Sequence, residues 1–598
     1  MAPGIVVIGV AGSGKTTVAS SLAGRRGARF VDADTLHPPA NLAKMSAGVP
    51  LDDDDRWPWL AAVRRELRSG GEVVVACSAL RRRYRDALRG AGDVRFVYLA
   101  MSREEAVRRV AGRSHHVFRA DLVASQFDAL EPPGADEGDV ATVDAGHPVD
   151  AVLGAAAAAL GTLPLGTGIA PLAAWTDDGP GISPAELDRV VGELAAGEIV
   201  ARGARRVLLV PPDHTRPHAR AAEIVARLST SLAAAGCTVA VAPAVGTHAP
   251  RPSWPGELVH RWRDGVVGIG VIGGDEVAAA SGGASHDPVP VEVAGFLLDR
   301  WDLVVSIGQV VPHEVVGMAN FTKNLVVGLG GAGTIGATHL LSARCGIETV
   351  MGRAGTPVRD VIDAAFDRFL APRLPVLWIL TVVEDATGGT VLRGVFAGRG
   401  GTGESGGAAF RAAAALAARC NVTEVDGPLA RVSCWLDPES VRTTWLGNKA
   451  VYRTRMALTD GGELVVLAPG VSAFGEDPII DGLIRRTGYR GAAAVEAARA
   501  TDPALAAEPG AVAHLVHGST EGRFTVVYCT DPAAGGLSSG EVEAAGYQWR
   551  PLGDERARLG VDGATPTGER LDVAGDPFFH VANPALGLWT TRAALSGV

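Results

Sequence analysis

One short segment near the start of the chain restricts its fold more than any other. Residues 9–16, GVAGSGKT, satisfy the pattern GxxxxGK[ST], directly after the apolar run 5–10 and before an amphipathic segment. In a strand–loop–helix unit of this kind, the glycines let backbone N–H groups close around phosphates. Lys15 adds positive charge, and the Thr16 hydroxyl can bind Mg²⁺. A chance glycine-rich turn is the alternative, but the strand before it and the helix after it favour a nucleotide site.

The chain is too long for one hydrophobic core. Its 598 residues suggest three or four domains. Apolar runs at 5–10, 73–76 and 94–99 predict buried parallel strands with helices between them. A helix at 151–160 is followed by a Gly/Pro/Thr stretch that is typical of a linker.

Alternation of strands and helices resumes near Ile199. We expect strands at 207–210, 239–241 and 303–307 and a helix at 221–235. The glycine-rich segment 398–407 is expected to be an exposed loop. The predicted fold class is α/β, with a parallel sheet in the first domain and two α/β domains after it. The expected divisions are 1–162, a linker at 163–178, and domains at 179–370 and 371–598.

Charge and cysteine content narrow the classes of partner. The formal net charge is -10, which argues against non-specific nucleic-acid binding. The six cysteines are scattered without a CxxC pair, as expected in a reducing compartment. No signal-peptide pattern opens the chain, and no apolar run reaches the roughly 18 residues that span a bilayer. We therefore predict a cytoplasmic protein that binds small molecules, neither nucleic acid nor membrane, and homo-oligomerisation is left open.

A series of motifs follows the phosphate loop in a fixed order. These are VDADTLHP at 31–38, PLDDDDRWPWL at 50–60, CSAL at 77–80 and SQF at 125–127. The series resembles the gluconate kinase family over nearly all of residues 1–160. The resemblance implies a P-loop gluconokinase domain that uses ATP and Mg²⁺ to phosphorylate a sugar acid. Residues Gly12, Ser13, Gly14, Lys15 and Thr16 would then bind the nucleotide.

Phosphoryl transfer depends on positioning and charge neutralisation. Asp34 is the candidate acceptor of the hydroxyl proton, and arginine suits a substrate carboxylate through bidentate pairing. Each arginine is equally well explained as a solvated surface charge, and the acidic run 52–55 as a solvated turn. The segment 113–118 departs from the His-Phe pairing usual in the family. By resemblance, the candidate substrate-binding residues are His37, Arg56, Arg81, Arg113 and Gln126.

A second group of polar residues lies between 213 and 339. DHTRP at 213–217 and GTH at 246–248 each follow a predicted strand, and PHEVVG at 312–317 precedes Lys323 and His339. Ligands bind where strands end in an open α/β sheet, and histidines gathered there can bind metal or transfer protons. Taken singly, each histidine is more often structural.

The joint pattern resembles the nickel-dependent lactate racemase family over roughly residues 180–598. The resemblance implies a nickel-pincer nucleotide tethered through a lysine, and inversion of a 2-hydroxy acid by hydride transfer. Two general acid/bases would serve the two faces of the substrate. The implied roles are Lys323 as tether, His339 as nickel ligand, His248 and His313 as acid/bases, Arg216 as the carboxylate partner, and Asp213 as a positioner of the cofactor or of Arg216.

One segment departs from the racemase pattern. In WLGNKA at 445–450, Leu446 stands where the family has Gln, while Lys449 is kept as a catalytic candidate. Because gluconate is a 2-hydroxy acid, we expect a bifunctional enzyme that interconverts gluconate and mannonate at C2 and phosphorylates gluconate. Two alternatives stay open. The second half could racemise another small 2-hydroxy acid such as lactate, or it could be an inactive binding module that regulates the kinase.

Overall fold

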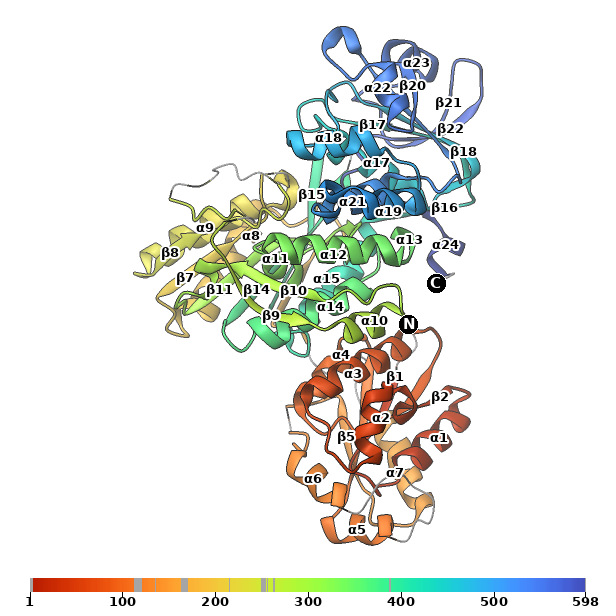
Figure 1. Cartoon of the computed structure of the whole chain (residues 1–598). Helices are drawn as coiled ribbons and strands as arrows, with labels where there is room; N and C mark the ends of the chain where they lie inside the picture. Colours follow the sequence, from red (N-terminus) through yellow and green to blue (C-terminus); the bar gives the residue numbers. More distant parts are fainter. Residues whose placement is uncertain are drawn as a thin grey trace.

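The computed structural model describes residues 4–111, 121–134, 136–162, 170–214, 216–248, 254, 256–261, 264–386 and 389–596. Three lobes follow one another along the chain, each built around its own sheet (Figure 1). The predicted α/β class, with a parallel sheet in the first domain, is confirmed.

The N-terminal domain has a five-stranded parallel sheet in the order β2-β3-β1-β4-β5. Its strands are β1 (Gly4–Ile8), β2 (Arg29–Asp32), β3 (Val73–Ala76), β4 (Val94–Ala100) and β5 (Val140–Asp144). Because both faces of β1 and β3 are buried, these strands are apolar throughout. The helices are α1 (Lys15–Arg26), α2 (Pro39–Ser46), α3 (Asp53–Arg68), α4 (Arg82–Arg89), α5 (Arg103–Ala111), α6 (Asp121–Ala129) and α7 (Val149–Thr162).

The middle domain has a six-stranded sheet in the order β6-β15-β14-β11-β7-β8. Strands β7, β8, β11 and β14 run parallel, whereas β15 and β6 are antiparallel additions at one edge. The strands are β6 (Ala173–Thr176), β7 (Arg206–Val210), β8 (Thr238–Val241), β11 (Leu303–Gln309), β14 (Val376–Ala386) and β15 (Gly389–Arg399).

Helices and two small hairpins complete the middle domain. The hairpins pair β9 (Val266–Ile272) with β10 (Val289–Ala294), and β12 (Pro312–His313) with β13 (Gly317–Met318). The helices are α8 (Pro184–Glu193), α9 (Ala221–Ala234), α10 (Gly274–Ser281), α11 (Thr322–Val326), α12 (Ala332–Cys345), α13 (Ile347–Val350), α14 (Pro357–Ala365) and α15 (Ser405–Asn421).

Two expectations about this region differ from the structure. A boundary between 370 and 371 would split the middle sheet, because β14 and β15 belong to it, and β6 falls inside the expected linker 163–178. The segment 398–407 is not an exposed loop, since residues 401–403 are buried. A Cβ on Gly403 would lie 2.5 Å from the Asp86 side chain, so the glycine permits close contact with the N-terminal domain.

The C-terminal domain has a third sheet in the order β20-β19-β18-β17-β22-β21, parallel except for β21. Its strands are β17 (Leu429–Trp435), β18 (Leu458–Leu467), β19 (Thr525–Thr530), β20 (Gln548–Pro551), β21 (Gly568–Leu571) and β22 (Pro577–Val581), and β16 (Val422–Val425) pairs separately with β23 (Leu588–Thr591). Its helices are α16 (Thr444–Gly447), α17 (Lys449–Thr454), α18 (Pro478–Thr487), α19 (Ala492–Thr501), α20 (Pro503–Ala506), α21 (Pro509–Gly518), α22 (Ser539–Ala544), α23 (Leu552–Leu559) and α24 (Arg592–Ser596).

Helix α3 of the N-terminal domain lies against α10 of the middle domain (Figure 1). Arg64 of α3 pairs with Asp360 of α14 at 2.9 Å, and both side chains are almost fully buried. Arg68 also pairs with Asp360, and Arg65 donates a hydrogen bond to the carbonyl of Ala279 at 2.8 Å. Removing one partner of a buried ion pair leaves an uncompensated charge, so this contact holds the first two domains in one arrangement.

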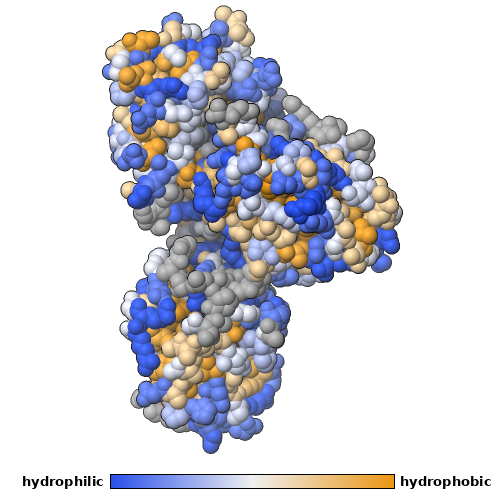
Figure 2. All heavy atoms as spheres, turned by 180° about the vertical axis from the view of Figure 1, so that it is seen from behind, coloured by the Kyte–Doolittle hydropathy of each residue, from blue (hydrophilic) through white to orange (hydrophobic). Residues whose placement is uncertain are grey.

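Within the described part of the chain, no helix combines the length and apolar character needed to cross a bilayer. On the face seen in Figure 2, apolar and polar residues are interspersed over the lobes.

Candidate functional sites

The first candidate site is a cavity of about 350 Å³ in the N-terminal domain. It lies between the phosphate loop, the segment after β2 and the start of α3. Of the residues predicted for the nucleotide and the sugar acid, those lining this cavity are Gly12, Gly14, Lys15, Thr16, Asp34, His37, Arg56 and Gln126.

The phosphate loop has the geometry that its glycines predict. Gly12 and Gly14 have φ of 84° and 90°, which side-chain-bearing residues rarely adopt. Gly14 also caps α1, so backbone N–H groups at that helix start face the cavity end where phosphates would bind. Lys15 donates to the carbonyl of Val10 at 2.9 Å, and buried Ser13 lies outside the lining.

Two carboxylates stand opposite the loop. The Thr16 hydroxyl donates to Asp32 at 3.3 Å, and the Asp32 side chain also accepts from the backbone N–H of Asp34 at 3.1 Å. Both aspartates line the cavity. Asp32, which the sequence interpretation left without a role, is therefore placed beside the hydroxyl expected to bind Mg²⁺.

His37 and Arg56 form the part of the cavity that is expected to bind the sugar acid, which accepts the phosphoryl group. The His37 ring stacks on Trp59 with centroids 4.4 Å apart, and Nδ1 accepts from the Asn41 amide at 3.3 Å. Burial, together with the charge of Arg56, lowers the pKa of His37 to about 4, so this imidazole is neutral near pH 7. Arg56 donates to the Tyr84 hydroxyl at 3.3 Å.

The other three candidate substrate-binding residues, Gln126, Arg81 and Arg113, have different locations. Gln126 accepts from the N–H of Ala11 at 2.7 Å, so its carbonyl is held against the phosphate loop. Arg81 lies outside the cavity lining and pairs with Asp53 at 3.4 Å. Arg113 lies outside the described residues.

The second candidate site is a cavity of about 110 Å³ between the middle and C-terminal domains. Its residues come from the ends of β7 and β11, from α11 and α12, and from α16, α17 and α21. All the residues singled out for the second half line it: Asp213, Arg216, His248, His313, Lys323, His339, Leu446 and Lys449.

His248 and His313 are held in opposite tautomers. Nδ1 of His248 lies 2.5 Å from a carboxylate oxygen of Asp213, which accepts, so Nδ1 carries a proton and Nε2 presents a lone pair. Nδ1 of His313 accepts from the N–H of Val315 at 3.1 Å, so the neutral ring carries its proton on Nε2. Burial lowers the pKa of His313 well below its ordinary value. The His248 ring can accept a proton from a ligand, and the His313 ring can donate a hydrogen bond to one.

Asp213 accepts the hydrogen bond that orients His248, a contact that the sequence did not predict. His339 on α12 donates from Nδ1 to the carbonyl of Ile335 at 2.6 Å, and burial lowers its pKa to about 4. The neutral ring therefore presents the Nε2 lone pair, as a metal-binding histidine held by its other nitrogen does.

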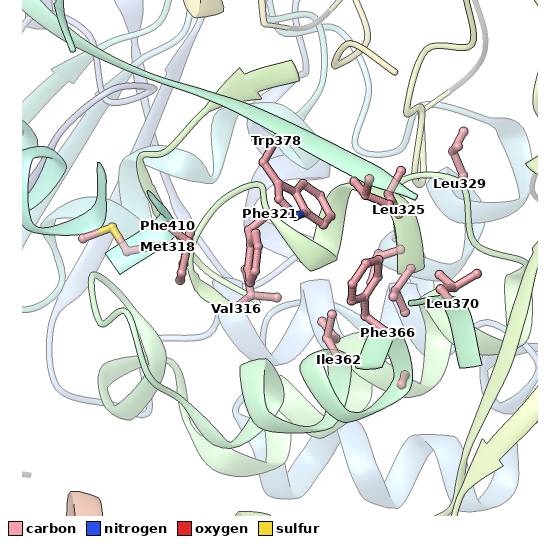
Figure 3. Close-up of a cluster of buried hydrophobic side chains, with 14 of the residues drawn as sticks. Val316, Met318, Phe321, Leu325, Leu329, Ile362, Phe366, Leu370, Trp378 and Phe410 are labelled. Carbon is pink, nitrogen blue, oxygen red and sulfur yellow. The ribbon is translucent and has the colours of Figure 1, made fainter. Parts of the chain in front are cut away.

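Lys323 follows a strained turn. Asn320 and Phe321 have φ of 66° and 59°, which non-glycine residues rarely adopt. The Phe321 ring is packed among the aromatic residues of the middle-domain core (Figure 3), with centroids 4.7 Å from Trp378 and 5.1 Å from Phe410. Arg359 donates to the carbonyl of Asn320 at 3.1 Å. Packing and hydrogen bonding together hold the turn that presents Lys323.

Both lysines of the second cavity have altered acidity. Burial and the nearby charge of Arg216 lower the pKa of Lys323 to about 7 and that of Lys449 to about 8. At pH 7 about half of Lys323 is then neutral, against roughly one molecule in 3,000 for an ordinary lysine. A neutral amine is the nucleophilic form, which suits a lysine that forms a covalent bond.

Several residues of the second cavity were missed by the sequence interpretation. His514 bonds the hydroxyls of Tyr452 and Tyr489, each at 2.8 Å, and stacks on Trp445. His514 and His517 come three residues apart on α21, a spacing that places both on one helix face and offers a detectable signal. Glu314, beside His313, also lines the cavity, and no pattern distinguishes it.

The rarity of lysine in this chain is a further sequence signal for the two candidate sites. The chain has four lysines among 56 lysines and arginines. Lys15, Lys323 and Lys449 line the two cavities, and Lys44 precedes Met45, which lines the first. Arginine cannot replace lysine where a small ammonium or a titratable amine is needed.

The altered acidity of Lys323 predicts its pattern of chemical labelling. With trace acetic anhydride and peptide mass spectrometry, acetylation of Lys323 should rise to a plateau with a midpoint near pH 7. Lys44 is the internal control, because its hydrogen bond to Asp55 raises its pKa and its labelling should still be rising at pH 9. Parallel profiles for the two lysines would contradict the lowered pKa.

Known proteins match the two halves separately. Residues 5–132 match the AAA domain family model. The chain is 47% identical over 149 residues to a probable gluconokinase of Schizosaccharomyces pombe, covering 23% of this chain and 77% of that protein. It is 42% identical over 153 residues to a thermoresistant gluconokinase of Escherichia coli, covering 25% and 87%. The N-terminal domain belongs to the gluconokinase family.

The second half matches a different family. Residues 184–349 match the model of the lactate racemase N-terminal domain. A crystal structure of a Thermotoga maritima protein covers 69% of this chain and 99% of its own length, with a TM-score of 0.58 and 18% identity. That likeness shows the fold of the middle and C-terminal domains. The predicted fusion of a gluconokinase domain with a lactate racemase-like module is confirmed.

Proposed function

We propose that the protein phosphorylates D-gluconate to 6-phosphogluconate with ATP and Mg²⁺, and that its second half epimerises a sugar acid at C2, interconverting gluconate and mannonate. The first activity is supported by the gluconokinase relatives and by the cavity that gathers the phosphate loop, Asp34, His37 and Arg56. The second is supported by the convergence of paired histidines, two lysines and Arg216 in one cavity.

In the kinase cavity, each group has a definable task. Lys15 and the α1 N-terminus would neutralise phosphate charge, and Thr16 with Asp32 would hold Mg²⁺. Asp34 would accept the proton of the sugar hydroxyl. Arg56 would pair with the carboxylate of the sugar acid, and neutral His37 would exchange hydrogen bonds with its hydroxyls.

The second cavity suits a nickel-pincer nucleotide. Lys323 offers a partly neutral amine for the covalent link, and His339 offers an Nε2 lone pair to nickel. No group of three metal-binding side chains occurs among the described residues. An adjoining cavity of about 250 Å³ shares Thr247, Trp445 and Gly510 with this one and adds to the space beside it. When bound, the cofactor supplies a hydride acceptor and donor.

The protein's own residues would bind the substrate and move its hydroxyl proton. Arg216 would hold the carboxylate of the 2-hydroxy acid. His248 would take the hydroxyl proton of one epimer, and His313, which carries its proton on Nε2, would donate a hydrogen bond to the hydroxyl oxygen on the other face. Leu446 presents an apolar side chain where the family has an amide, which disfavours lactate as the substrate.

The test is NMR of gluconate in deuterated water with cofactor-loaded protein and no ATP, so that the kinase is silent. We expect gluconate and mannonate to interconvert while each keeps protium at C2, because the hydride chemistry that the cofactor would supply does not release the C2 hydrogen to water. Lactate should turn over slowly or not at all.

Two results would count against this function. Extensive deuteration at C2 would show proton abstraction in place of hydride transfer. Rapid lactate racemisation with inert gluconate would overturn the substrate, and would favour the alternative of a kinase fused to a racemase for a small 2-hydroxy acid.

A further inference from the structure

Glu314 is a carboxylate inside the second cavity that the proposed chemistry does not use. It occupies the turn between β12 and β13, one residue after His313, and lines the cavity. The turn is fixed, because the Ser342 hydroxyl donates to the carbonyl of Glu314 at 2.9 Å. The backbone from which the carboxylate extends is therefore held in place at the cavity wall.

The Glu314 carboxylate is compensated in charge, but one of its two oxygens has no hydrogen-bond donor among the described residues. Burial opposes its ionisation, but the positive charges of Arg453 and Lys449 and a hydrogen bond from its own backbone N–H hold its pKa well below the ordinary value. Its Oε2 is buried, and no described residue donates a hydrogen bond to it. Arg453 and Nδ1 of His313 lie 4.0 and 3.8 Å away, too far for hydrogen bonds, and that Nδ1 already accepts from Val315.

A buried carboxylate oxygen without a donor is costly, so a ligand that brings a hydroxyl donor to Oε2 would be favoured at this position. His313, next to Glu314, is the residue proposed to donate a hydrogen bond to the hydroxyl at the reacting carbon. The hydroxyl of the neighbouring carbon is the group a 2,3-dihydroxy acid would place next along the chain. Lactate has a methyl group there, which would leave the carboxylate unsatisfied.

We propose that Glu314 accepts a hydrogen bond from the C3 hydroxyl of the substrate and makes the second site selective for 2,3-dihydroxy acids. This inference rests on the proposed 2-hydroxyacid chemistry of the site. It adds a specificity residue and names the substrate class by a hydroxyl that gluconate, mannonate and the small acid glycerate share. A site built to bond a hydroxyl rejects the analogue that lacks it.

Glycerate and lactate differ only in the C3 hydroxyl, so their ratio of kcat/KM isolates this contact. Both are assayed on one preparation of cofactor-loaded protein, which cancels differences in loading. We expect the wild type to prefer glycerate by about 10- to 100-fold, the range of a charge-assisted hydrogen bond. E314L should abolish the preference, and E314Q, which keeps an acceptor oxygen, should retain part of it.

E348Q is the matched control, because Glu348 pairs with Arg455 outside the cavity lining and its loss should leave the ratio unchanged. An equal loss on both substrates in E314L would show that Glu314 is only a counter-charge and would overturn the inference. Gluconate is assayed on the same preparations. If gluconate is inert but the glycerate preference depends on Glu314, the gluconate assignment fails and the inference stands. If neither dihydroxy acid reacts, both fail.

Discussion

Lys323→Ala is expected to remove the covalent cofactor adduct and to reduce epimerisation to background. The physical reason is the position of the amine: it is buried, its pKa is lowered to about 7, and the strained turn at Asn320 and Phe321 holds it in the cavity. Alanine removes the only atom that can form the link at this position. Intact mass spectrometry of protein from a cofactor-producing host measures the adduct directly, and NMR measures epimerisation.

Lys449→Ala provides the matched comparison, because Lys449 lines the same cavity and is also buried. This variant should keep the adduct while losing turnover. Loss of the adduct in Lys449→Ala, with the adduct retained in Lys323→Ala, would show that Lys449 is the tether and that the role proposed for Lys323 is wrong. His339→Ala should keep the adduct mass of the organic part but lower the nickel content of the purified protein.

Lys15→Ala is expected to lower the rate of gluconate phosphorylation by about 100- to 1,000-fold, which is the effect of removing one group that stabilises the charge of a transition state. Lys15 lines the first cavity at the phosphate loop, and no other lysine does so among the described residues. A coupled assay of ADP formation with gluconate and ATP gives the rate. Epimerisation should be unchanged, because the two cavities share no residue.

Lys44→Ala is the control for the kinase assay. Lys44 is partly exposed and pairs with Asp55, so its loss should change phosphorylation only a few-fold. Loss of both activities in folded Lys15→Ala would show that the two sites are coupled. Normal phosphorylation by that variant would remove Lys15 from its role.

The sequence predicted the parallel-sheet elements well because they are local patterns. The local sequence is enough to predict the strand at 73–76 and the backbone conformation of the glycines in the phosphate loop. Residues that end consecutive parallel strands meet at one sheet edge, which is why His248 and His313 could be brought together from sequence.

The features that the sequence did not predict depend on contacts between segments far apart in the chain. β14 and β15 form a long hairpin with no helix between them, so they broke the alternation by which the middle domain was recognised. The glycines near 403 indicated a loop, but they permit close packing against another domain. The contact of Asp213 with His248 and the donor-free Oε2 of Glu314 are fixed by side-chain placement, which no spacing in the sequence encodes.

The buried contact between α3 and α14 has a consequence for synthesis on the ribosome. Arg68 is made 292 residues before Asp360, which at roughly 5–20 residues per second means a wait of about 15–60 s. During that time the kinase domain can complete its own sheet while this face remains in water. Because the waiting side chains Arg64 and Arg68 are charged, the unfinished face stays hydrated and does not attract neighbouring nascent chains. An apolar interface at the same place would expose the growing protein to aggregation.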